Sequence, residues 1–266
     1  MSYEMIEYSV ENGVATIAFN RPEVLNALND QITKEATNAF KTAKRDTEVR
    51  AITLTGNGRG FSSGADLTSG NLIQNTPDGQ RPGAGDHLKK VYHPLINLIV
   101  SIEKPVIGVI NGIAAGIGMS VALATDIRIV SDKAAFTLGF GKIGLVPDGG
   151  ASWILPKLIG YNRAYQMYLT SEKVSAETAL TWGLVNQVVP HAQLMEVATA
   201  TATKLAAGPT MAFGLAKRAM RQAAEQTFDE SLTAEVYLQN HAGRSEDFAE
   251  GVMAFLTKRA PQYKGR

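Results

Sequence analysis

Strand-like and helix-like apolar patterns follow one another in a repeating order along this chain, and that order constrains the fold more than any other feature. The opening residues alternate apolar and polar around an Asn12-Gly13 turn, which predicts a β-hairpin. A helix capped by Asn29 and a strand at 51–55 follow, and helical spacing then returns over 88–102 before a buried strand at 105–110. Such alternation is typical of an α/β protein.

The pattern changes near residue 190. Further strands are predicted at 125–130 and 184–189, and after them only helical patterns follow, at 194–207, 209–224, 228–240 and 245–259. We therefore expect an α/β core of residues 1–190 and a C-terminal helical region of residues 191–266. Between Thr68 and Gly85 the sequence is rich in glycine and proline and poor in apolar residues, which predicts a mobile loop.

Composition excludes several classes of protein. The 266 residues, 45% of them hydrophobic, are enough to bury a large core, and a net charge of +1 argues against nucleic-acid binding. The chain has no cysteine, and its four histidines show no metal-ligand spacing, so we expect neither a disulfide nor a metal site. No apolar run reaches the ~20 residues of a membrane span, and the N-terminus lacks signal-peptide features. We expect a soluble, cytoplasmic protein.

A single carboxylate, Asp148, stands between two apolar runs in the stretch KIGLVPDGGASWILP, residues 142–156. One interpretation is structural, because Pro-Asp-Gly-Gly is turn chemistry and Asp148 could cap a helix through Ser152 and Leu155. The other is catalytic, because a carboxylate shielded from water has a raised pKa and can act as a general base or acid. The side chains expected to shield it are Ile143, Leu145, Val146 and Trp153. This stretch alone leaves both interpretations open.

Several glycine-rich stretches carry weaker signals. Residues 60–64 match the G-x-S-x-G pattern of serine hydrolases, but no helix is predicted directly after them. Neither 56–60 nor 116–118 completes the G-x-G-x-x-G pattern of dinucleotide-binding loops. Residues 63–66 and 114–119 instead combine small side chains with strand and helix ends, where backbone N–H groups are open to a ligand. Two such donors around one oxygen would form an oxyanion hole.

Taken together, these motifs resemble a known family. The stretches GRGFSSGADL (58–67), KPVIGVINGIAAGIGMSVALATDIRI (104–129) and FGKIGLVPDGG (140–150) are similar to the enoyl-CoA hydratase/isomerase, or crotonase, family. NRPEVLNALN (20–29) and the last residues of the chain extend the likeness. The resemblance implies a crotonase-like spiral of repeated ββα turns, with C-terminal helices that build a homotrimer or a dimer of trimers. It also implies that coenzyme A enters with the acyl-CoA substrate and that no separate cofactor is needed.

The resemblance also assigns residues to the site. It implies that the N–H groups of Ala65 and Ile117 bind the thioester oxygen and that Asp148 is the catalytic acid or base. The coenzyme A channel would be lined by Leu25, Ala27, Ala65, Asp66 and Leu67. Phe255 and Lys258, from a neighbouring subunit, would contact the adenosine and its phosphate.

Two departures from the family pattern bear on the reaction. The resemblance places Ser120 and Phe140 where hydratases carry two glutamates, so general acid–base help worth roughly 10²–10⁴-fold per group is absent for hydration. We therefore expect an isomerase that converts 3-enoyl-CoA to 2-enoyl-CoA with Asp148 as proton carrier. An epoxide isomerase acting on 1,2-epoxyphenylacetyl-CoA and a hydratase are the alternatives.

A protein that binds coenzyme A or RNA without turnover is the alternative outside enzymes. In the first helix, however, Lys34 and Lys41 are mixed with Glu35, which argues against an RNA-binding row of lysines.

Overall fold

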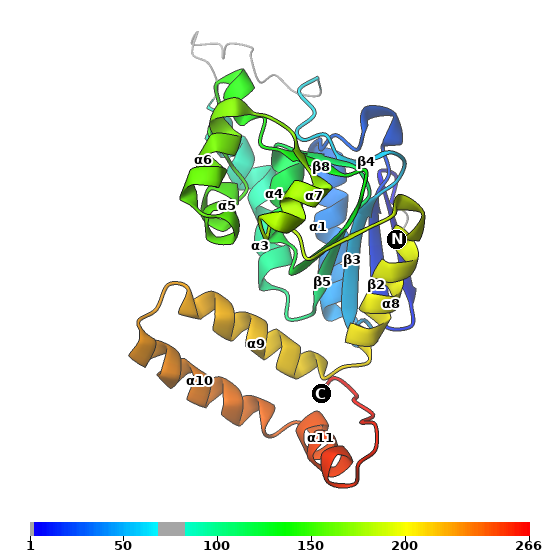
Figure 1. Cartoon of the computed structure of the whole chain (residues 1–266). Helices are drawn as coiled ribbons and strands as arrows, with labels where there is room; N and C mark the ends of the chain where they lie inside the picture. Colours follow the sequence, from blue (N-terminus) through cyan, green and yellow to red (C-terminus); the bar gives the residue numbers. More distant parts are fainter. Residues whose placement is uncertain (1–2, 69–82) are drawn as a thin grey trace.

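A computed structural model describes residues 3–68 and 83–266 of the chain. Its larger sheet has the strand order β1-β2-β3-β5-β7-β10 (Figure 1). β1 and β2 form the predicted hairpin, with Asn12 and Gly13 both at positive φ, and the other neighbours in the sheet are parallel. The strands are β1 (Ile6–Glu11), β2 (Val14–Phe19), β3 (Ala51–Gly56), β5 (Val106–Ile110), β7 (Ile127–Ser131) and β10 (Gln187–Val189).

A smaller sheet is built from the strands that follow those of the larger one. Its order is β4-β6-β8-β9, and its members are β4 (Gly60–Ser62), β6 (Ile113–Ala115), β8 (Ala135–Thr137) and β9 (Val174–Ser175). The consecutive pairs β3/β4, β5/β6 and β7/β8 therefore each place one strand in each sheet. With the helices between the pairs, this arrangement is the predicted spiral of ββα turns.

Helices cover and connect the two sheets. α1 begins where predicted, because the Asn29 side chain accepts a hydrogen bond from the Ile32 N–H, and Ile32, Ala36 and Phe40 are buried in the core. A π-helical turn at Leu88–Tyr92 precedes α3, which has Pro94 in its first turn. The helices of this part are α1 (Asp30–Arg45), α2 (Ala84–His87), α3 (His93–Ser101), α4 (Ile117–Ala124), α5 (Ala151–Ile159), α6 (Tyr161–Thr170) and α7 (Ala176–Thr181).

The last four helices end the chain, as predicted. α8 packs against the larger sheet through Leu194, Ala198 and Ala202. α9 and α10 lie side by side, and α11 lies at the end of α10 away from the connection between α9 and α10 (Figure 1). Their bounds are α8 (Leu194–Ala206), α9 (Thr210–Ala223), α10 (Phe228–Ala242) and α11 (Glu246–Leu256).

Two segments have different boundaries in the structure from those predicted from the sequence. The strand expected at 184–189 is wrong in its first half, because Leu184 and Val185 are buried in the turn after α7 and only Gln187–Val189 pairs with β7. The loop expected between Thr68 and Gly85 falls largely on residues 69–82, outside the described residues. Its last residues, Ala84 and Gly85, begin α2.

Candidate active site

Two glycine-containing loops meet where the smaller sheet reaches the start of α4. Gly64, at φ +103°, lies so close to β6 that a Cβ atom there would stand 3.0 Å from the Ala115 carbonyl oxygen. Gly116 lies opposite Gly64 and has a φ of +50°. A Cβ atom added to Gly116 would stand 3.9 Å from the Gly64 Cα. The backbone at both positions favours glycine, because an L side chain is strained at positive φ, and at Gly64 a Cβ atom would also press on the Ala115 carbonyl. The contact therefore brings the backbone of Ala65 near that of Ile117.

Neither the Ala65 N–H nor the Ile117 N–H donates to another backbone group in the part of the chain that the structure describes. Ile117 is the first residue of α4, where N–H groups have no partner within the helix. Ala65 is held in a parallel bridge by Leu28, whose N–H donates to the Gly64 carbonyl at 2.7 Å and whose carbonyl accepts from the Asp66 N–H at 3.0 Å. Such donors can stabilise a negatively charged oxygen.

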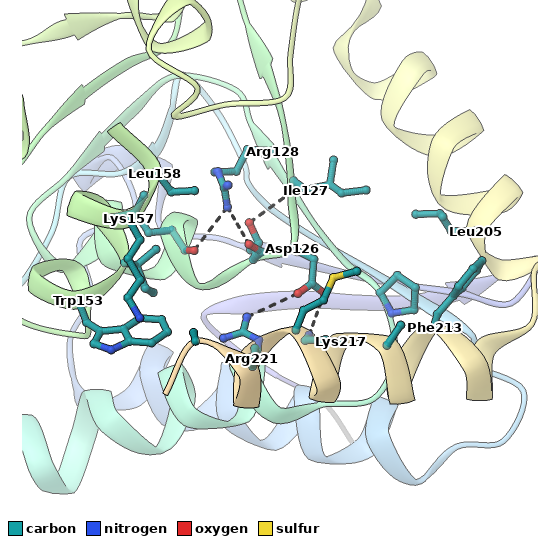
Figure 2. Close-up of a pocket in the computed structure, with 17 residues that line it drawn as sticks. Asp126, Ile127, Arg128, Trp153, Lys157, Leu158, Leu205, Phe213, Lys217 and Arg221 are labelled. Carbon is teal, nitrogen blue, oxygen red and sulfur yellow. Dashed lines mark hydrogen bonds and ion pairs between the residues drawn. The ribbon is translucent and has the colours of Figure 1, made fainter. Parts of the chain in front are cut away.

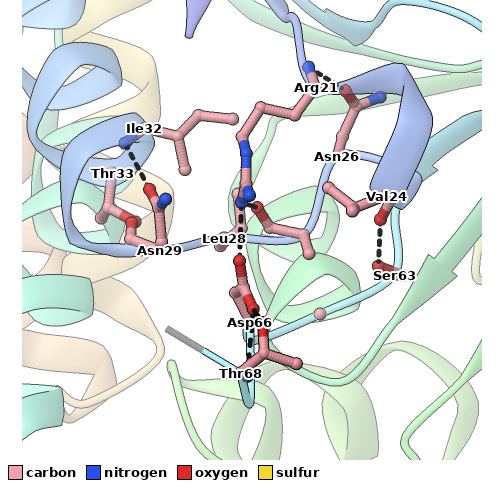
Figure 3. A network of polar contacts seen from close by, with 12 residues as sticks. Arg21, Val24, Asn26, Leu28, Asn29, Ile32, Thr33, Ser63, Asp66 and Thr68 are labelled. Atoms are coloured by element: carbon pink, nitrogen blue, oxygen red, sulfur yellow. Dashed lines mark hydrogen bonds and ion pairs between the residues drawn. The ribbon is translucent and has the colours of Figure 1, made fainter. Parts of the chain in front are cut away.

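Arg21 and Asp66 form an ion pair beside this bridge (Figure 3). The Arg21 Nη1 atom donates to the Asp66 carboxylate at 2.9 Å and to the Ala27 carbonyl at 2.8 Å. Both side chains are mostly buried, with 17% and 8% of their surface exposed. Hydrogen bonds from Thr68, and then the Arg21 guanidinium, hold the pKa of Asp66 below its usual value. Asp66 therefore stays ionised and ties the Ala65 loop to the N-terminal turn.

Asp148 is in a different environment. Burial raises the pKa of its carboxyl to about 6, and its Oδ1 atom is buried without a hydrogen-bond partner among the described residues. Its main-chain carbonyl accepts a hydrogen bond from the Ser120 hydroxyl of α4 at 2.9 Å. The pKa of the Tyr92 hydroxyl is raised mainly by burial and also by the nearby Asp148 charge. A carboxyl with this pKa and no fixed donor can accept and return a proton near neutral pH.

The structure corrects two expectations about Asp148. The helix-cap interpretation is wrong, because α5 begins after Gly150 and no side chain caps it; Asp148 contributes only its carbonyl, which accepts from the Ala151 N–H. The expected shielding side chains are also wrong in the single chain. Ile143, Leu145, Val146 and Trp153 are exposed, Val146 to 72%. Ile143, Leu145 and Val146 belong to a glycine-rich turn and Trp153 to α5, whereas Asp148 lies against α4 and close to Tyr92.

The structure gathers some of the predicted substrate-binding residues. The Leu25 carbonyl accepts from the Ser63 N–H at 2.8 Å, so the turn of Leu25 and Ala27 lies against the loop of Ala65, Asp66 and Leu67. Phe255 and Lys258 are not near them in one chain, because α11 lies at the far end of the molecule from β4 (Figure 1). Phe255 is 83% exposed.

Sequence reasoning missed Arg21 and Tyr92. Arg21 precedes Pro22 in a turn, and its partner Asp66 is 45 positions away, so no local pattern connects them. Tyr92 stands four residues after Leu88 and three before Leu95, so helical spacing predicts its burial, but no local pattern reports that its hydroxyl donates to the Leu28 carbonyl at 3.1 Å. Both side chains support the Leu28–Ala65 bridge.

The serine of the G-x-S-x-G match has a structural role. The Ser62 hydroxyl is fully buried, donates to the Asn26 carbonyl at 2.9 Å and accepts from the Gly64 N–H. Within 3–68 and 83–266, no group of three His, Cys, Asp or Glu side chains is arranged to hold a metal ion. In the same residues, no helix is long and apolar enough to cross a membrane.

A cavity of about 490 Å³ lies elsewhere, between α9 and the core (Figure 2). Its charged side chains are largely engaged with one another: Asp126 accepts from Lys217 at 2.8 Å and lies 3.6 Å from Arg221. The buried Arg128 guanidinium donates to backbone carbonyls of Leu184 and Thr125. These contacts tie α9 to the core. Of the side chains expected around Asp148, Trp153 lines this cavity, but none of the predicted catalytic or substrate-binding residues does.

Comparison with known proteins agrees with this geometry. The family described as enoyl-CoA hydratase/isomerase matches residues 9–266. The chain is 42% identical to the 1,2-epoxyphenylacetyl-CoA isomerase of Escherichia coli K12, over 99% of both chains. It is also 42% identical, over the full length of both, to a Rhodobacter capsulatus protein named "probable enoyl-CoA hydratase".

Solved structures show the same fold. An enoyl-CoA hydratase from Bacillus anthracis superimposes with a TM-score of 0.91 at 30% identity, over 99% of this chain and 100% of that one. The fold, the paired glycine loops and the matches over nearly the whole length lead to one conclusion: the chain has the crotonase fold and belongs to the enoyl-CoA hydratase/isomerase family.

Proposed function

We propose that this protein is an acyl-CoA isomerase that moves a double bond from the 3 position to the 2 position of an enoyl-CoA thioester. Asp148 carries this proposal: its buried Oδ1 atom has no hydrogen-bond partner among the described residues, and the pKa of its carboxyl is raised to about 6. A carboxyl with this pKa is mostly ionised at pH 7 and can remove a proton, and it is a stronger base than an ordinary aspartate.

The reaction needs one proton carrier and one anion site. The Asp148 carboxylate removes the proton from C2, and the electron pair of that bond shifts to give an enolate whose negative charge lies on the thioester oxygen. The N–H groups of Ala65 and Ile117 donate to that oxygen, which holds more charge in the enolate than in the substrate. The electron pair of the C3–C4 double bond then takes the proton from Asp148 at C4, the C1–C2 pair of the enolate becomes the C2–C3 double bond, and the thioester carbonyl is restored.

The environment of Asp148 supports isomerisation over hydration. Hydration needs a group that activates water as well as a proton donor, and Ser120 and Phe140 stand at the two positions where the resemblance places glutamates in hydratases. Phe140 has no acid–base group, and the Ser120 hydroxyl is fully buried against the Asp148 carbonyl. Hydration of crotonyl-CoA is therefore expected to be slow.

A panel of three substrates tests the proposal. Purified protein is given cis-3-enoyl-CoA, crotonyl-CoA and a ring epoxide of phenylacetyl-CoA, and kcat/KM is measured for each. We expect the 3-enoyl thioester to be converted fastest. A comparable kcat/KM for crotonyl-CoA would mean that another group activates water and that the assignment is wrong.

A second candidate, isomerisation of 1,2-epoxyphenylacetyl-CoA, is favoured by the 42% identity to the E. coli enzyme of that name. Both reactions could use the same anion site and the same carboxylate. The epoxide arm of the panel distinguishes them, since the second candidate requires the epoxide to be the best substrate.

We further propose that the protein works as a trimer or a dimer of trimers. α10 and α11 expose large apolar side chains, among them Phe228, Tyr237 and Phe255, more than a monomeric protein of this kind ordinarily leaves in water. A neighbouring subunit could cover them and bring its Phe255 and Lys258 to the coenzyme A moiety. Sedimentation of the wild type and of Val236→Asp, which places a charge on this surface, tests the assembly; a fully active wild-type monomer would contradict it.

A further inference from the structure

The carboxylate of Asp148 is positioned without hydrogen bonds of its own. In the described part of the chain, the hydrogen bonds of this residue run through its main chain, and the Oδ1 atom has none. The place of the carboxylate is therefore set by the backbone at Asp148 and its neighbours. The catalytic importance of this placement rests on the proposed function, in which Asp148 is the base.

Two donors meet at the Asp148 carbonyl. One is the Ala151 N–H of α5 at 3.0 Å, and the other is the Ser120 hydroxyl of α4 at 2.9 Å. Ser120 is fully buried and stands three residues after Ile117 in α4, so the two residues share one face of that helix. A single side chain thus connects the helix that presents the Ile117 N–H with the residue that carries the carboxylate.

Gly149 brings the two segments into direct contact. Its φ is +56°, and an added Cβ would lie 2.5 Å from the Ile117 Cδ1 atom and 2.8 Å from the Ser120 Cβ. No L side chain fits in that conformation and that space. The Asp148 backbone is therefore seated against α4 with no gap, and the Ser120 hydrogen bond fixes its orientation.

We propose that Ser120 is a positioning residue that holds the Asp148 carboxylate at a fixed position relative to the Ile117 N–H. A serine hydroxyl has one proton to donate, and its other acceptor within reach, the Gly116 carbonyl at 3.4 Å, is more distant than the Asp148 carbonyl. At the position where the resemblance places a catalytic glutamate in hydratases, Ser120 orients the proton carrier and transfers no proton itself.

Two substitutions at this position test the hydrogen bond. Ser120→Ala removes the donor, and Ser120→Cys replaces it with a weak donor. We expect both variants to lose about tenfold in kcat with little change in KM, because a base displaced by a fraction of an ångström reacts more slowly while the thioester still binds.

A matched control lies in the larger sheet. The buried Thr55 hydroxyl donates to the Val109 carbonyl at 2.8 Å, so Thr55→Val also removes a buried hydroxyl-to-carbonyl hydrogen bond, but one with no contact to Asp148. We expect it to lower the melting temperature to a similar extent and to leave kcat unchanged. A general loss of stability would instead affect kcat in both proteins.

Crystal structures of the wild type and the Ser120→Cys variant give a second readout that does not depend on the reaction. We expect the Asp148 carboxylate to be displaced by a fraction of an ångström in the variant, less than the ~1 Å misplacement that can cost 10²-fold in rate. An unmoved carboxylate, or a kcat within twofold of wild type in the Ala and Cys variants, overturns the proposal. If the wild type converts no 3-enoyl-CoA, the proposed function fails, and the position of the carboxylate still decides the role of Ser120.

Discussion

Asp66 and Asp148 are both aspartates of the candidate site, but their surroundings differ. Asp66 accepts hydrogen bonds from Thr68 and Arg21, and its pKa is lowered. Asp148 has a buried oxygen without a partner among the described residues, and its pKa is raised to about 6. The same side chain is thus a fixed negative charge in one loop and a potential proton carrier in the other. When the surroundings of two acids move their pKa values in opposite directions, one acid can keep a fixed charge while the other transfers a proton.

The largest expected effect comes from removing the unpaired carboxylate. Asp148→Asn should lower kcat for isomerisation by at least ~10²-fold, because an amide cannot accept the C2 proton. The fold and the binding of acyl-CoA should be retained. Steady-state kinetics with a cis-3-enoyl-CoA, together with a binding assay, checks both parts, and near-wild-type turnover would remove Asp148 from the mechanism.

An isotope experiment sharpens the same point. Deuterium placed at C2 of the substrate should appear in part at C4 of the product in ordinary water if one shielded base carries it. Complete loss of the label would leave Asp148 as the base but show that its proton exchanges with solvent during turnover.

The pH dependence of activity should report Asp148 and not Asp66. The reaction needs Asp148 deprotonated, so kcat/KM should fall on the acid side with an apparent pKa near 6, about tenfold per pH unit below it. Asp66, whose pKa is lowered, remains ionised through that range. An acid limb centred near the ordinary aspartate value of 3.8 would show that Asp148 is better hydrated than the structure indicates.

Removing the ion pair between Arg21 and Asp66 should affect substrate binding and protein stability more than the chemical step. Arg21→Gln removes the guanidinium that donates to the mostly buried Asp66 carboxylate, so we expect a loss of about 1–3 kcal/mol in the free energy of unfolding and a higher KM. The kcat should change by no more than a few-fold. Chemical denaturation and kinetics measure these quantities.

A surface ion pair provides the control for that change. Arg218 and Glu103 also form an ion pair, but both side chains are exposed, so Arg218→Gln should cost less than about 1 kcal/mol. Equal losses for the two variants would mean that burial of the Arg21–Asp66 pair adds nothing to the free energy of unfolding.

The smallest effect is the contribution of the Asp148 carboxyl to the stability of the folded protein. Its pKa is higher in the folded protein, so the protonated form contributes stability that is present below pH 3.8 and is lost as the pH rises through about 6. The shift corresponds to at most about 3 kcal/mol, and partial exposure reduces the expected value to about 1 kcal/mol. Asp148→Asn should therefore melt higher than wild type at pH 7 and similarly at pH 4. A variant that is less stable at pH 7 would contradict this sign.

The order of elements was predictable because it depends on local chemistry. Asn12-Gly13 favours positive φ and therefore a hairpin, and Asn29 offers an oxygen to the first turn of α1, so both predictions are confirmed. The family followed from the glycine loops at 58–67 and 104–129, which the comparisons confirm. These features are readable because each residue acts on neighbours within a few positions.

The electrostatic character of the two aspartates was decided only in three dimensions. Arg21 reaches Asp66 across 45 positions, and Ser120 reaches Asp148 across 28, so no pattern in the sequence reports either contact. The sequence by itself predicted which loops could offer backbone N–H groups, and its resemblance to the family associated Asp148 with them. Only the packing of α4 and Tyr92 beside Asp148, in place of the apolar neighbours expected from the sequence, decided that this carboxyl is buried without a partner, because the pKa of an acid depends on the atoms around it in space.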